Sequence, residues 1–206
     1  MSSAQTRKRR SDGERSRAAI LDEAAKLSTV EGLGGLSLAR LADAVGMSKS
    51  GLFAHFGSKE ELQLATIDSA ASVFEAHVVE PGLRAPEGLP RLHAFVDHYL
   101  RYVERDVFPG GCFFAAALTE MNMQPGLVRD RLVAVFDGWL GLLAETVRQA
   151  QAKGEVDPNE DPDQLAFELE AAFFLANNQF VVKHTAEPLE RARRTIEQRL
   201  AAISLP

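Results

Sequence analysis

The clearest chemical pattern in this sequence is a set of serine and lysine residues in its first third. Ser37, Ser48 and Ser58 each precede a run of helix-forming residues, where a side-chain oxygen accepts hydrogen bonds from the free N–H groups of a helix. Lys49 and Lys59 directly follow two of these serines and add a positive charge at the same helix starts. Free N–H groups together with a cation bind phosphate, so this pattern predicts contact with nucleic acid.

Two short helices and a tight turn are needed to position these side chains. The apolar residues of the first helix recur at helical spacing: Leu38, Leu41, Ala42 and Val45. Gly46 ends this helix because glycine readily adopts the left-handed conformation, and a second helix runs from Ser48 through Phe56. Residues 58–61 form a capping box that opens the next helix. Two helices joined by a short turn that contains Gly form a helix-turn-helix, which docks its second helix in the DNA major groove.

This segment resembles the DNA-binding signature of the tetracycline-repressor-like (TetR) family of transcriptional regulators. The matching positions are Leu41-Ala42, Val45-Gly46, Ser48, Leu52, His55-Phe56, Ser58-Lys59 and Leu62. The family usually has Gly where this sequence has Ser50, and Tyr where it has Phe53. The resemblance implies a three-helix DNA-binding head, a helical body that dimerises through its last two helices, and a small apolar or amphipathic effector that binds in the body.

We expect base contacts from the start of the second helix of the motif, namely Lys49, Ser50 and Gly51. The other candidate DNA-binding residues are expected at helix starts or beside the phosphates: Ser37, Arg40, Ser48, Phe53, His55 and Lys59. Leu52 is expected to point inward and pack on the first helix of the head. A basic arm is expected to enter an adjacent minor groove, with Arg7, Lys8, Arg9 and Arg10. Simpler roles stay open, since Arg40 could be a solvated charge, His55 a helix cap, and the arm a solubilising tail.

The composition is that of a soluble globular protein. The chain has 206 residues, of which 46% are hydrophobic and 25% charged, and its net charge is −6. No apolar run approaches the roughly 18–20 residues that a membrane-spanning helix needs. The basic N-terminus is not followed by the apolar core of a signal peptide, so we expect a cytoplasmic protein that does not enter a membrane.

The charge is divided unevenly along the chain. Residues 1–62 hold 10 Lys and Arg against 8 Asp and Glu, whereas residues 63–206 hold 13 against 21. An acidic body behind a mildly basic head is repelled by phosphates and helps to orient the head toward DNA.

The periodicity of apolar residues predicts an all-α, nine-helix protein without strands. We expect a disordered basic arm (1–12), a helix-turn-helix domain (13–60), a connecting helix (61–80), and an effector-binding and dimerisation domain (81–206). No proline precedes Pro81, and all nine prolines lie from there on, where they separate the later helices. The expected helices of the connecting region and body are 58–79, about 91–107, 112–122, 124–153, 162–184 and 188–203.

Thirteen of the 15 aromatic residues fall within residues 63–206, that is, in the connecting helix and the body. The residues alone favour a plain core over a ligand pocket. The small effectors that the family resemblance implies make the two interpretations about equal. The candidate pocket residues are Phe95, Tyr99, Tyr102, Phe113, Phe114, Met121, Phe136, Trp139, Phe173, Phe174 and Asn177. A ligand bound there is expected to shift the connecting helix and so release DNA.

The last two helices are expected to form a homodimer. The candidate interface residues share one broad face of helix 162–184 and a narrow stripe of helix 188–203: Leu165, Leu169, Ala172, Phe173, Ala176, Phe180, Ile196 and Leu200. Phe167, Phe174 and Val181 lie on other faces of helix 162–184. This helix is therefore expected to meet the body on one side and a partner subunit on the other.

No catalytic, metal-ligating or phosphate-loop motif is found, so we expect neither an enzyme nor a cofactor. Cys112 is the only cysteine and has apolar neighbours, which favours a buried thiol over a redox sensor. Two alternatives remain open at this point: an all-helical ligand-binding protein that has no operator, and an activator of the same build. The sequence therefore predicts a DNA-binding regulator, most simply a repressor that a small molecule releases from a palindromic operator.

Overall fold

The computed structural model describes the backbone of residues 3–205 and the side chains of residues 13–205. The elements are α1 (Ser3–Glu31), α2 (Leu38–Ala44), α3 (Lys49–Phe56), α4 (Lys59–Phe74), η1 (Glu75–Val79), α5 (Glu80–Leu83), α6 (Leu89–Glu104), α7 (Phe113–Met121), α8 (Leu127–Ala152), α9 (Pro162–Lys183) and α10 (Glu187–Ile203). Because α4, η1 and α5 follow one another without a break, the described part of the chain has nine helical segments, as predicted. Its only β-type pairing is one isolated bridge between Val156 and Ser204.

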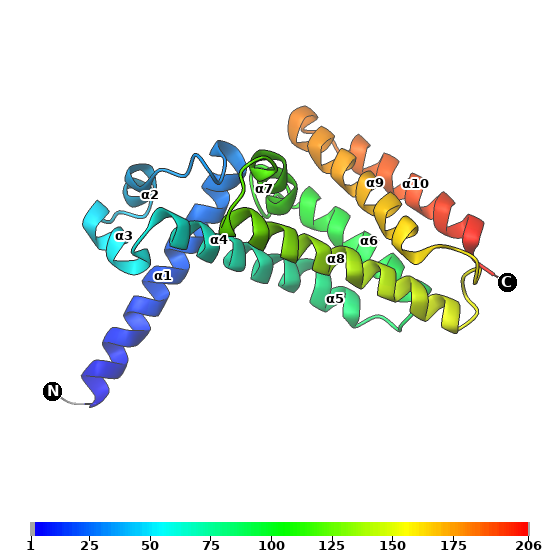
Figure 1. The fold of residues 1–206 in the computed structure, drawn as a ribbon, viewed down its shortest axis with the longest axis horizontal. Helices are drawn as coiled ribbons and strands as arrows, with labels where there is room; N and C mark the ends of the chain where they lie inside the picture. The colour runs from blue at the N-terminus through cyan, green and yellow to red at the C-terminus, as the bar shows by residue number, and fades with distance from the viewer. Residues whose placement is uncertain (1–2, 206) are drawn as a thin grey trace.

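Figure 1 shows a small head formed by α1, α2 and α3, joined through α4 to a larger body. The head has its own hydrophobic core, made by Ile20, Ala24, Leu36, Leu41, Ala42, Leu52, Phe56 and Leu62. A second and much larger core fills the body. The head therefore has a separate small cluster, while Ala25 of α1 and Leu33 of the following loop belong to the core of the body.

The first helix is longer than expected, because α1 begins at Ser3 and not at Gly13. Residues 3–12 contain neither proline nor glycine, and residues such as Ala4, Gln5 and Arg7 favour a helix, so nothing in this stretch ends it. The expected disordered arm is thus helical in its backbone. The side chains of Arg7, Lys8, Arg9 and Arg10 lie outside the described side chains.

The connecting helix also runs further than expected, through the π-helical turn η1 and into α5. Pro81 lies just after this wide turn. A proline within a helix lacks an N–H group and crowds the carbonyl of the preceding turn, and a widened turn accommodates it.

In contrast, α6 ends at Glu104, three residues earlier than expected, and Asp106 then has a positive φ of 48°.

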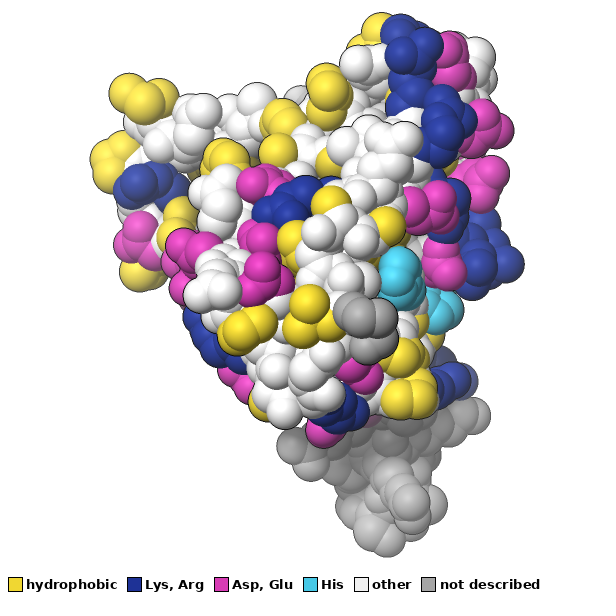
Figure 2. All heavy atoms as spheres, turned by 90° about the vertical axis from the view of Figure 1, so that its right-hand side faces the viewer, with side chains coloured by type: hydrophobic (Ala, Val, Ile, Leu, Met, Phe, Trp, Pro, Cys, Tyr) yellow, Lys and Arg dark blue, Asp and Glu magenta, His cyan; other side chains and the backbone are white. Residues whose placement is uncertain are grey.

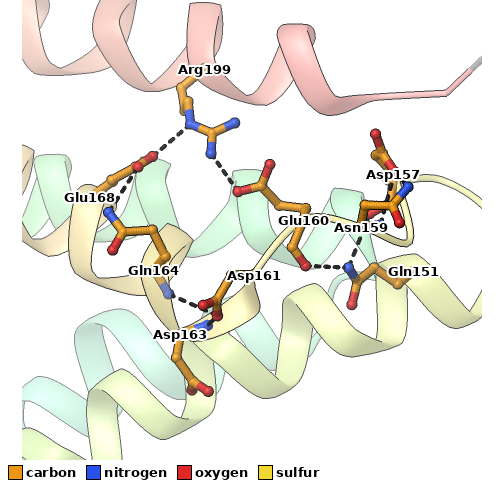
Figure 3. Close-up of polar contacts among 9 residues, drawn as sticks. All are labelled: Gln151, Asp157, Asn159, Glu160, Asp161, Asp163, Gln164, Glu168 and Arg199. Atoms are coloured by element: carbon orange, nitrogen blue, oxygen red, sulfur yellow. Dashed lines mark hydrogen bonds and ion pairs between the residues drawn. The ribbon is translucent and has the colours of Figure 1, made fainter.

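The helices α9 and α10 lie side by side at the edge of the body (Figure 1), where one arginine joins them. The Arg199 guanidinium contacts the Glu168 carboxylate at 2.6 Å and also that of Glu160 in the α8–α9 loop (Figure 3). Hydrogen bonds from Gln164 and Arg199 lower the pKa of Glu168. Gln151 of α8 donates to the backbone carbonyls of residues 157 and 160, so the loop is fixed from both sides.

The end of the body that faces away from the head carries charges of both signs. Figure 2 shows Lys, Arg, Asp and Glu side chains intermixed there with scattered hydrophobic ones. Such a surface offers no continuous positive patch for a phosphate backbone. None of the described helices is long and apolar enough to cross a membrane.

Candidate DNA-binding head and ligand cavity

The second helix of the motif, α3, is fixed on one face and open on the other. Its inner residues Leu52 and Phe56 are buried in the core of the head, which confirms that Leu52 points inward. Ser48 caps the helix, since its hydroxyl oxygen accepts a hydrogen bond from the Gly51 N–H at 3.1 Å. Lys49 is exposed, so the first turn of α3 presents a basic side chain to solvent.

The turns around α3 follow the local chemistry expected from the sequence. Gly46 has a φ of +66° directly after the end of α2, and Gly57 has a φ of +71° at the end of α3. Both values lie in the left-handed region that glycine adopts without strain. Ser37 and Ser58 cap α2 and α4 through hydrogen bonds from the N–H groups of Arg40 and Glu61.

Two of the expected phosphate contacts already have partners inside the protein. The Lys59 ammonium donates to the Gly34 carbonyl at 2.6 Å, and the Arg40 guanidinium pairs with the Glu31 carboxylate at 2.5 Å. Both side chains are exposed, so neither charge is hidden from a phosphate. In the free protein, however, these cations hold the loop and helix ends around them in place.

Arg17 of α1 was not singled out by the sequence, yet it fixes the end of α3. Its guanidinium donates to the His55 carbonyl at 2.8 Å and lies 4.3 Å from the centre of the Phe56 ring. The first contact supplies a hydrogen-bond donor to a carbonyl group that has no partner within the helix, because it lies at the helix end. The second contact is a cation–π interaction. The sequence could not predict this contact, because the residues that it joins are 38 positions apart.

The expected base-contact residues are brought together at one end of α3. Ser50 is exposed and its hydroxyl lies 3.2 Å from that of Ser48. Gly51 is partly buried, and a Cβ atom there would come within 3.1 Å of the Ser48 hydroxyl. Phe53 is 49% exposed, which is unusual for a large apolar side chain on a helix otherwise packed into a core. The side of α3 that carries these residues is therefore largely exposed, with Gly51 partly buried.

The body contains a cavity of about 550 Å³ that is partly open to solvent. Its walls come from α4 and η1, α6, α7, α8 and α9, and most of them are aromatic or aliphatic. Five of the candidate pocket residues line it: Tyr99, Phe114, Phe136, Trp139 and Phe174. The volume lies within the roughly 300–1,000 Å³ typical of small-molecule sites.

Six candidate pocket residues do not line this cavity: Phe95, Tyr102, Phe113, Met121, Phe173 and Asn177. All six are buried in the body, the five apolar ones among its core residues, because a periodicity argument identifies buried faces without saying which of them meets an opening. Asn177 has a structural role, since its carbonyl oxygen accepts a hydrogen bond from the Cys112 N–H at 2.7 Å. This bond joins α9 to the loop before α7.

The sequence reading missed Phe74 and Glu170, both of which line the cavity. Phe74 of α4 makes edge contacts with the rings of Tyr99, Phe114 and Trp139. Glu170 stands between apolar residues three or four positions away on either side, a signal that could have identified it as an acid on a buried helix face.

Glu170 is an acidic group held in an apolar wall. One of its oxygens, Oε2, accepts a hydrogen bond from the Trp139 Nε1–H at 3.1 Å. Burial raises the pKa of this carboxyl group to about 7, although the hydrogen bond from Trp139 acts in the opposite direction. The hydroxyl of Tyr99, another cavity residue, is buried without a hydrogen-bond partner in the structure. The cavity therefore holds two polar groups whose bonding capacity is incompletely used.

Cys112 lines the same cavity, and its thiol is buried. Burial raises its pKa to about 11, which keeps the thiol protonated at neutral pH. The thiolate is the reactive form of cysteine. Its surroundings therefore agree with the expectation of a small buried hydrophobic residue.

One loop of the head is held by residues of two body helices. The Glu120 carboxylate of α7 accepts hydrogen bonds from the N–H groups of Leu33 and Gly34, at 2.6 and 2.8 Å. On α4, Gln63 donates to the Leu33 carbonyl at 2.8 Å, beside the Lys59 contact described above. A Cβ atom at Gly32 or at Gly34 would lie 2.7 Å from the Glu120 carboxylate and would displace it, and the φ of +89° at Gly32 itself favours glycine. Sequence reasoning missed this junction because its partners are 86 and 87 residues apart.

Most candidate dimer residues point inward, contrary to expectation. Leu165, Leu169, Phe173, Ala176, Ile196 and Leu200 belong to the core of the same protomer, and Ala172 and Phe180 are partly buried against it. The reason is that α9 packs against both α8 and α10, so its broad apolar face is used within the chain. The exposed stripe of α9 consists instead of Phe167, Ala171, Phe174, Leu175, Asn178 and Val182.

Among the described residues, no group of three or more acidic, histidine or cysteine side chains could hold a metal ion.

The comparisons with known proteins agree with this architecture. A family model described as "Bacterial regulatory proteins, tetR family" matches residues 20–66. A second, described as "Tetracyclin repressor-like, C-terminal domain", matches residues 88–196. The first covers the helix-turn-helix with the second part of α1, and the second covers more than half of the whole chain.

Two relatives and a solved structure are similar to this chain. The chain is 28% identical over 141 residues to the transcriptional regulator AcuR of Cereibacter sphaeroides, a match that covers 67% of this chain and 64% of AcuR. It is 30% identical over 154 residues to the HTH-type transcriptional repressor ComR of Escherichia coli, covering 73% of this chain and 72% of ComR. Its fold is similar to a crystal structure of a TetR transcriptional regulator from Chloroflexus aurantiacus, with a TM-score of 0.88, 29% identity, and 95% and 99% of the two chains covered.

The fold and its two sites thus define an all-α protein with a helix-turn-helix head and a cavity-bearing body. The chain belongs to the tetracycline-repressor-like family of transcriptional regulators. All of these matches are to regulators, in line with the expectation that the chain is not an enzyme.

Proposed function

We propose that this protein is a sequence-specific DNA-binding transcriptional regulator, a homodimeric repressor that a small molecule releases from a palindromic operator. The observation that carries the proposal is the open first turn of α3, whose opposite face is fixed in the core of the head. A helix held in this way presents its N-terminal residues to the major groove as one rigid unit.

Lys49, Ser50 and Gly51 are the base-contact residues of this proposal. A lysine donates to guanine O6 and N7, a serine hydroxyl pairs with several base edges, and glycine permits close approach. Ser37, Arg40, Ser48, Phe53, His55 and Lys59 flank them toward the phosphates, and residues 7–10 extend the basic surface along α1. Arg40 and Lys59 exchange or share their internal partners when they meet a phosphate, since both pairs are exposed.

The partner surface is the outer stripe of α9 rather than the inward faces expected from the sequence. Phe167, Leu175 and Val182 are 64%, 58% and 79% exposed, and they recur at helical spacing on one face. Large apolar side chains in such a row are costly in water and stabilising when covered. A two-fold axis at this stripe would pair α9 with its copy and set the two heads at a fixed spacing.

The cavity is connected to the head through the walls it shares with α4 and α7. Phe74 and Glu75 line it where α4 passes into η1, and Leu118 and Thr119 line it on α7, two residues and one residue before Glu120. A ligand that moves either wall changes the position of the loop that holds the start of α2. Such a ligand releases DNA only to the extent that it prefers the state with low DNA affinity.

The test is a selection from random duplex DNA with the purified full-length protein at moderate salt. The expected result is enrichment of a palindrome with half-sites about one helical turn apart. Lys49→Ala is expected to cost about 1–3 kcal/mol and to relax the preference at one position of each half-site. Lys26→Ala, a change of equal charge on α1 away from α3, is the matched control. Retention without any enriched sequence, lost steeply as salt rises, would contradict operator recognition.

A further inference from the structure

The cavity described above has a one-sided charge. Glu75 and Glu170 are its charged lining residues, and both are acidic; no Lys, Arg or His among the described side chains lines it. An anionic ligand would therefore meet like charge without a compensating cation. Transfer of an anionic ligand from water to a site beside these carboxylates is unfavourable. A cation beside a buried carboxylate is favourable.

The hydrogen bonds of Glu170 indicate which kind of ligand group would bind beside it. Among the described residues only the Trp139 indole donates a hydrogen bond to this carboxyl group, and it does so to a single oxygen. The other oxygen, Oε1, accepts no hydrogen bond from the described residues and is left to solvent or to a ligand. A carboxylate accepts hydrogen bonds at several lone-pair positions, and a positively charged donor forms the strongest of them.

The surrounding rings favour the same kind of ligand. Trp139 and Phe74 meet edge to face with ring centres 5.1 Å apart, and Tyr99, Phe114, Phe136 and Phe174 complete the aromatic wall. Aromatic faces attract cations, most strongly those of tryptophan, and they also pack well on an apolar ligand body. The unpartnered Tyr99 hydroxyl supplies one further polar contact.

We infer that the cavity binds an organic cation, with an apolar or aromatic body among the rings and one basic or quaternary nitrogen beside Glu170. This inference rests on the proposed function only in that it gives the chemistry of the effector. The ligand class is set by the carboxyl group, by the aromatic lining and by the lack of basic residues among the lining side chains. Neutral analogues of the same shape bind more weakly, and anionic analogues more weakly still.

The test uses three probes of one shape on the intact protein: 4-phenylbutylamine, 4-phenylbutanol and 4-phenylbutyrate. Trp139 is the only tryptophan in the chain and lines the cavity, so its fluorescence reports binding at this site, and calorimetry gives the affinities. The amine is expected to bind about tenfold more tightly than the alcohol, and the carboxylate more weakly than both. The quaternary phenylbutyltrimethylammonium ion is expected to follow the amine.

Glu170→Gln separates charge from shape, because the amide oxygen still accepts the Trp139 hydrogen bond. This variant is expected to lose the preference for the amine and to bind the alcohol within about twofold of the wild type. Glu145→Gln, an equal charge change at an exposed position of α8, is the matched control and should keep the preference. If Glu170→Gln folds poorly, the wild-type amine affinity between about pH 6 and pH 8 replaces it, and it should rise with pH as the carboxyl group ionises.

Equal affinity for amine and alcohol, tighter binding of the carboxylate, no binding of any probe, or an unchanged preference in Glu170→Gln would each overturn the inference. None of these outcomes touches the operator selection, in which no probe is present and Glu170 plays no part. Failure of the ligand class and failure of DNA recognition are therefore observed in separate experiments.

Discussion

The head and the body of this protein reach stability by different routes, and this difference explains what each can do. The head has a small core and depends on hydrogen bonds that fix helix ends, such as those of Ser48 and Arg17. The body has a large aromatic core that nevertheless leaves a cavity of about 550 Å³. A rigid small unit suits the reading of a fixed groove, whereas a large core with an opening suits a ligand that changes its packing.

The two regions meet through apolar side chains, such as Ala25 and Leu33 in the core of the body, and through polar contacts at residues 32–34. Side chains from α4 and α7 satisfy the N–H and carbonyl groups of this loop, so the position of the head depends on where two cavity walls lie. Hydrogen bonds are directional and lose their strength with small displacements. A shift of α4 or α7 therefore moves the loop at residues 32–34 with it, whereas apolar side chains alone would allow the two regions to slide past each other.

The largest expected effect tests whether the head is a separate cooperative unit. Leu52 is fully buried in the head, and Leu52→Ala is expected to cost about 2–5 kcal/mol and to abolish operator binding. Because the core of the head is separate from that of the body, Trp139 fluorescence should still report a folded body. Thermal unfolding followed both by circular dichroism and by Trp139 fluorescence measures this. The neighbouring Phe53→Ala, at a half-exposed position, should change stability by less than about 0.5 kcal/mol.

A parallel loss of both signals in Leu52→Ala would contradict the comparison, since head and body would then unfold as one unit. An unchanged operator affinity would contradict the role of the head core in holding α3.

The next effect concerns the body alone and depends on pH. Glu170 has a pKa of about 7 in the folded protein, against an ordinary value of 4.5. Below about pH 4 the carboxyl group is neutral in both states, and between about 4.5 and 7 the unfolded chain releases the proton while the folded chain keeps it. The free energy of unfolding therefore falls as pH rises through this window, by at most about 3 kcal/mol, and is then constant.

Glu170→Gln should remove this contribution, so that its stability relative to wild type increases from about pH 4.5 to pH 7. Chemical denaturation at a series of pH values measures the difference. Glu75→Gln changes the other acid of the lining, and Glu145→Gln an exposed one; both controls separate Glu170 from the general titration of carboxyl groups. Tyr99 and Cys112 also face the cavity, and burial raises the pKa of both, so they stay neutral in this range. A difference between wild type and Glu170→Gln that does not vary with pH would contradict the assignment.

A smaller effect is expected where the body meets its partner. Leu175→Arg places a charge at the middle of the exposed stripe of α9 and is expected to weaken the dimer by about 2 kcal/mol or more. Met123→Arg makes the same change at an exposed position before α8, outside the stripe, and should leave the dimer intact. Light scattering after gel filtration over a range of concentrations measures the association. A dimer that resists Leu175→Arg would place the interface elsewhere on the body.

The fold and the head were largely predictable from the sequence, because their signals are local. The capping serines, Gly46 and Gly57 act within four residues of themselves, and each has the role that its spacing predicts. The body was predictable only as helices. Which faces of α9 are inward, and which aromatic residues meet an opening, depend on how α8, α9 and α10 pack together, and Leu169 and Phe173 lie inside the protomer for that reason.

The smallest expected effect tests the junction itself. Glu120→Gln keeps the size of the side chain, but it replaces one of the two accepting oxygens with an NH₂ group that faces a backbone N–H of Leu33 or Gly34. One hydrogen bond to a charged acceptor is thereby lost, at a cost of about 1 kcal/mol, or roughly fivefold in operator affinity. Hydrogen exchange at the two amides should become faster while Trp139 fluorescence in the cavity stays unchanged. Glu145→Gln again serves as the control. If these amides keep their protection and the operator affinity is unaltered, the loop is held by α4 alone, and the cavity communicates with the head through Gln63 and Lys59 rather than through α7.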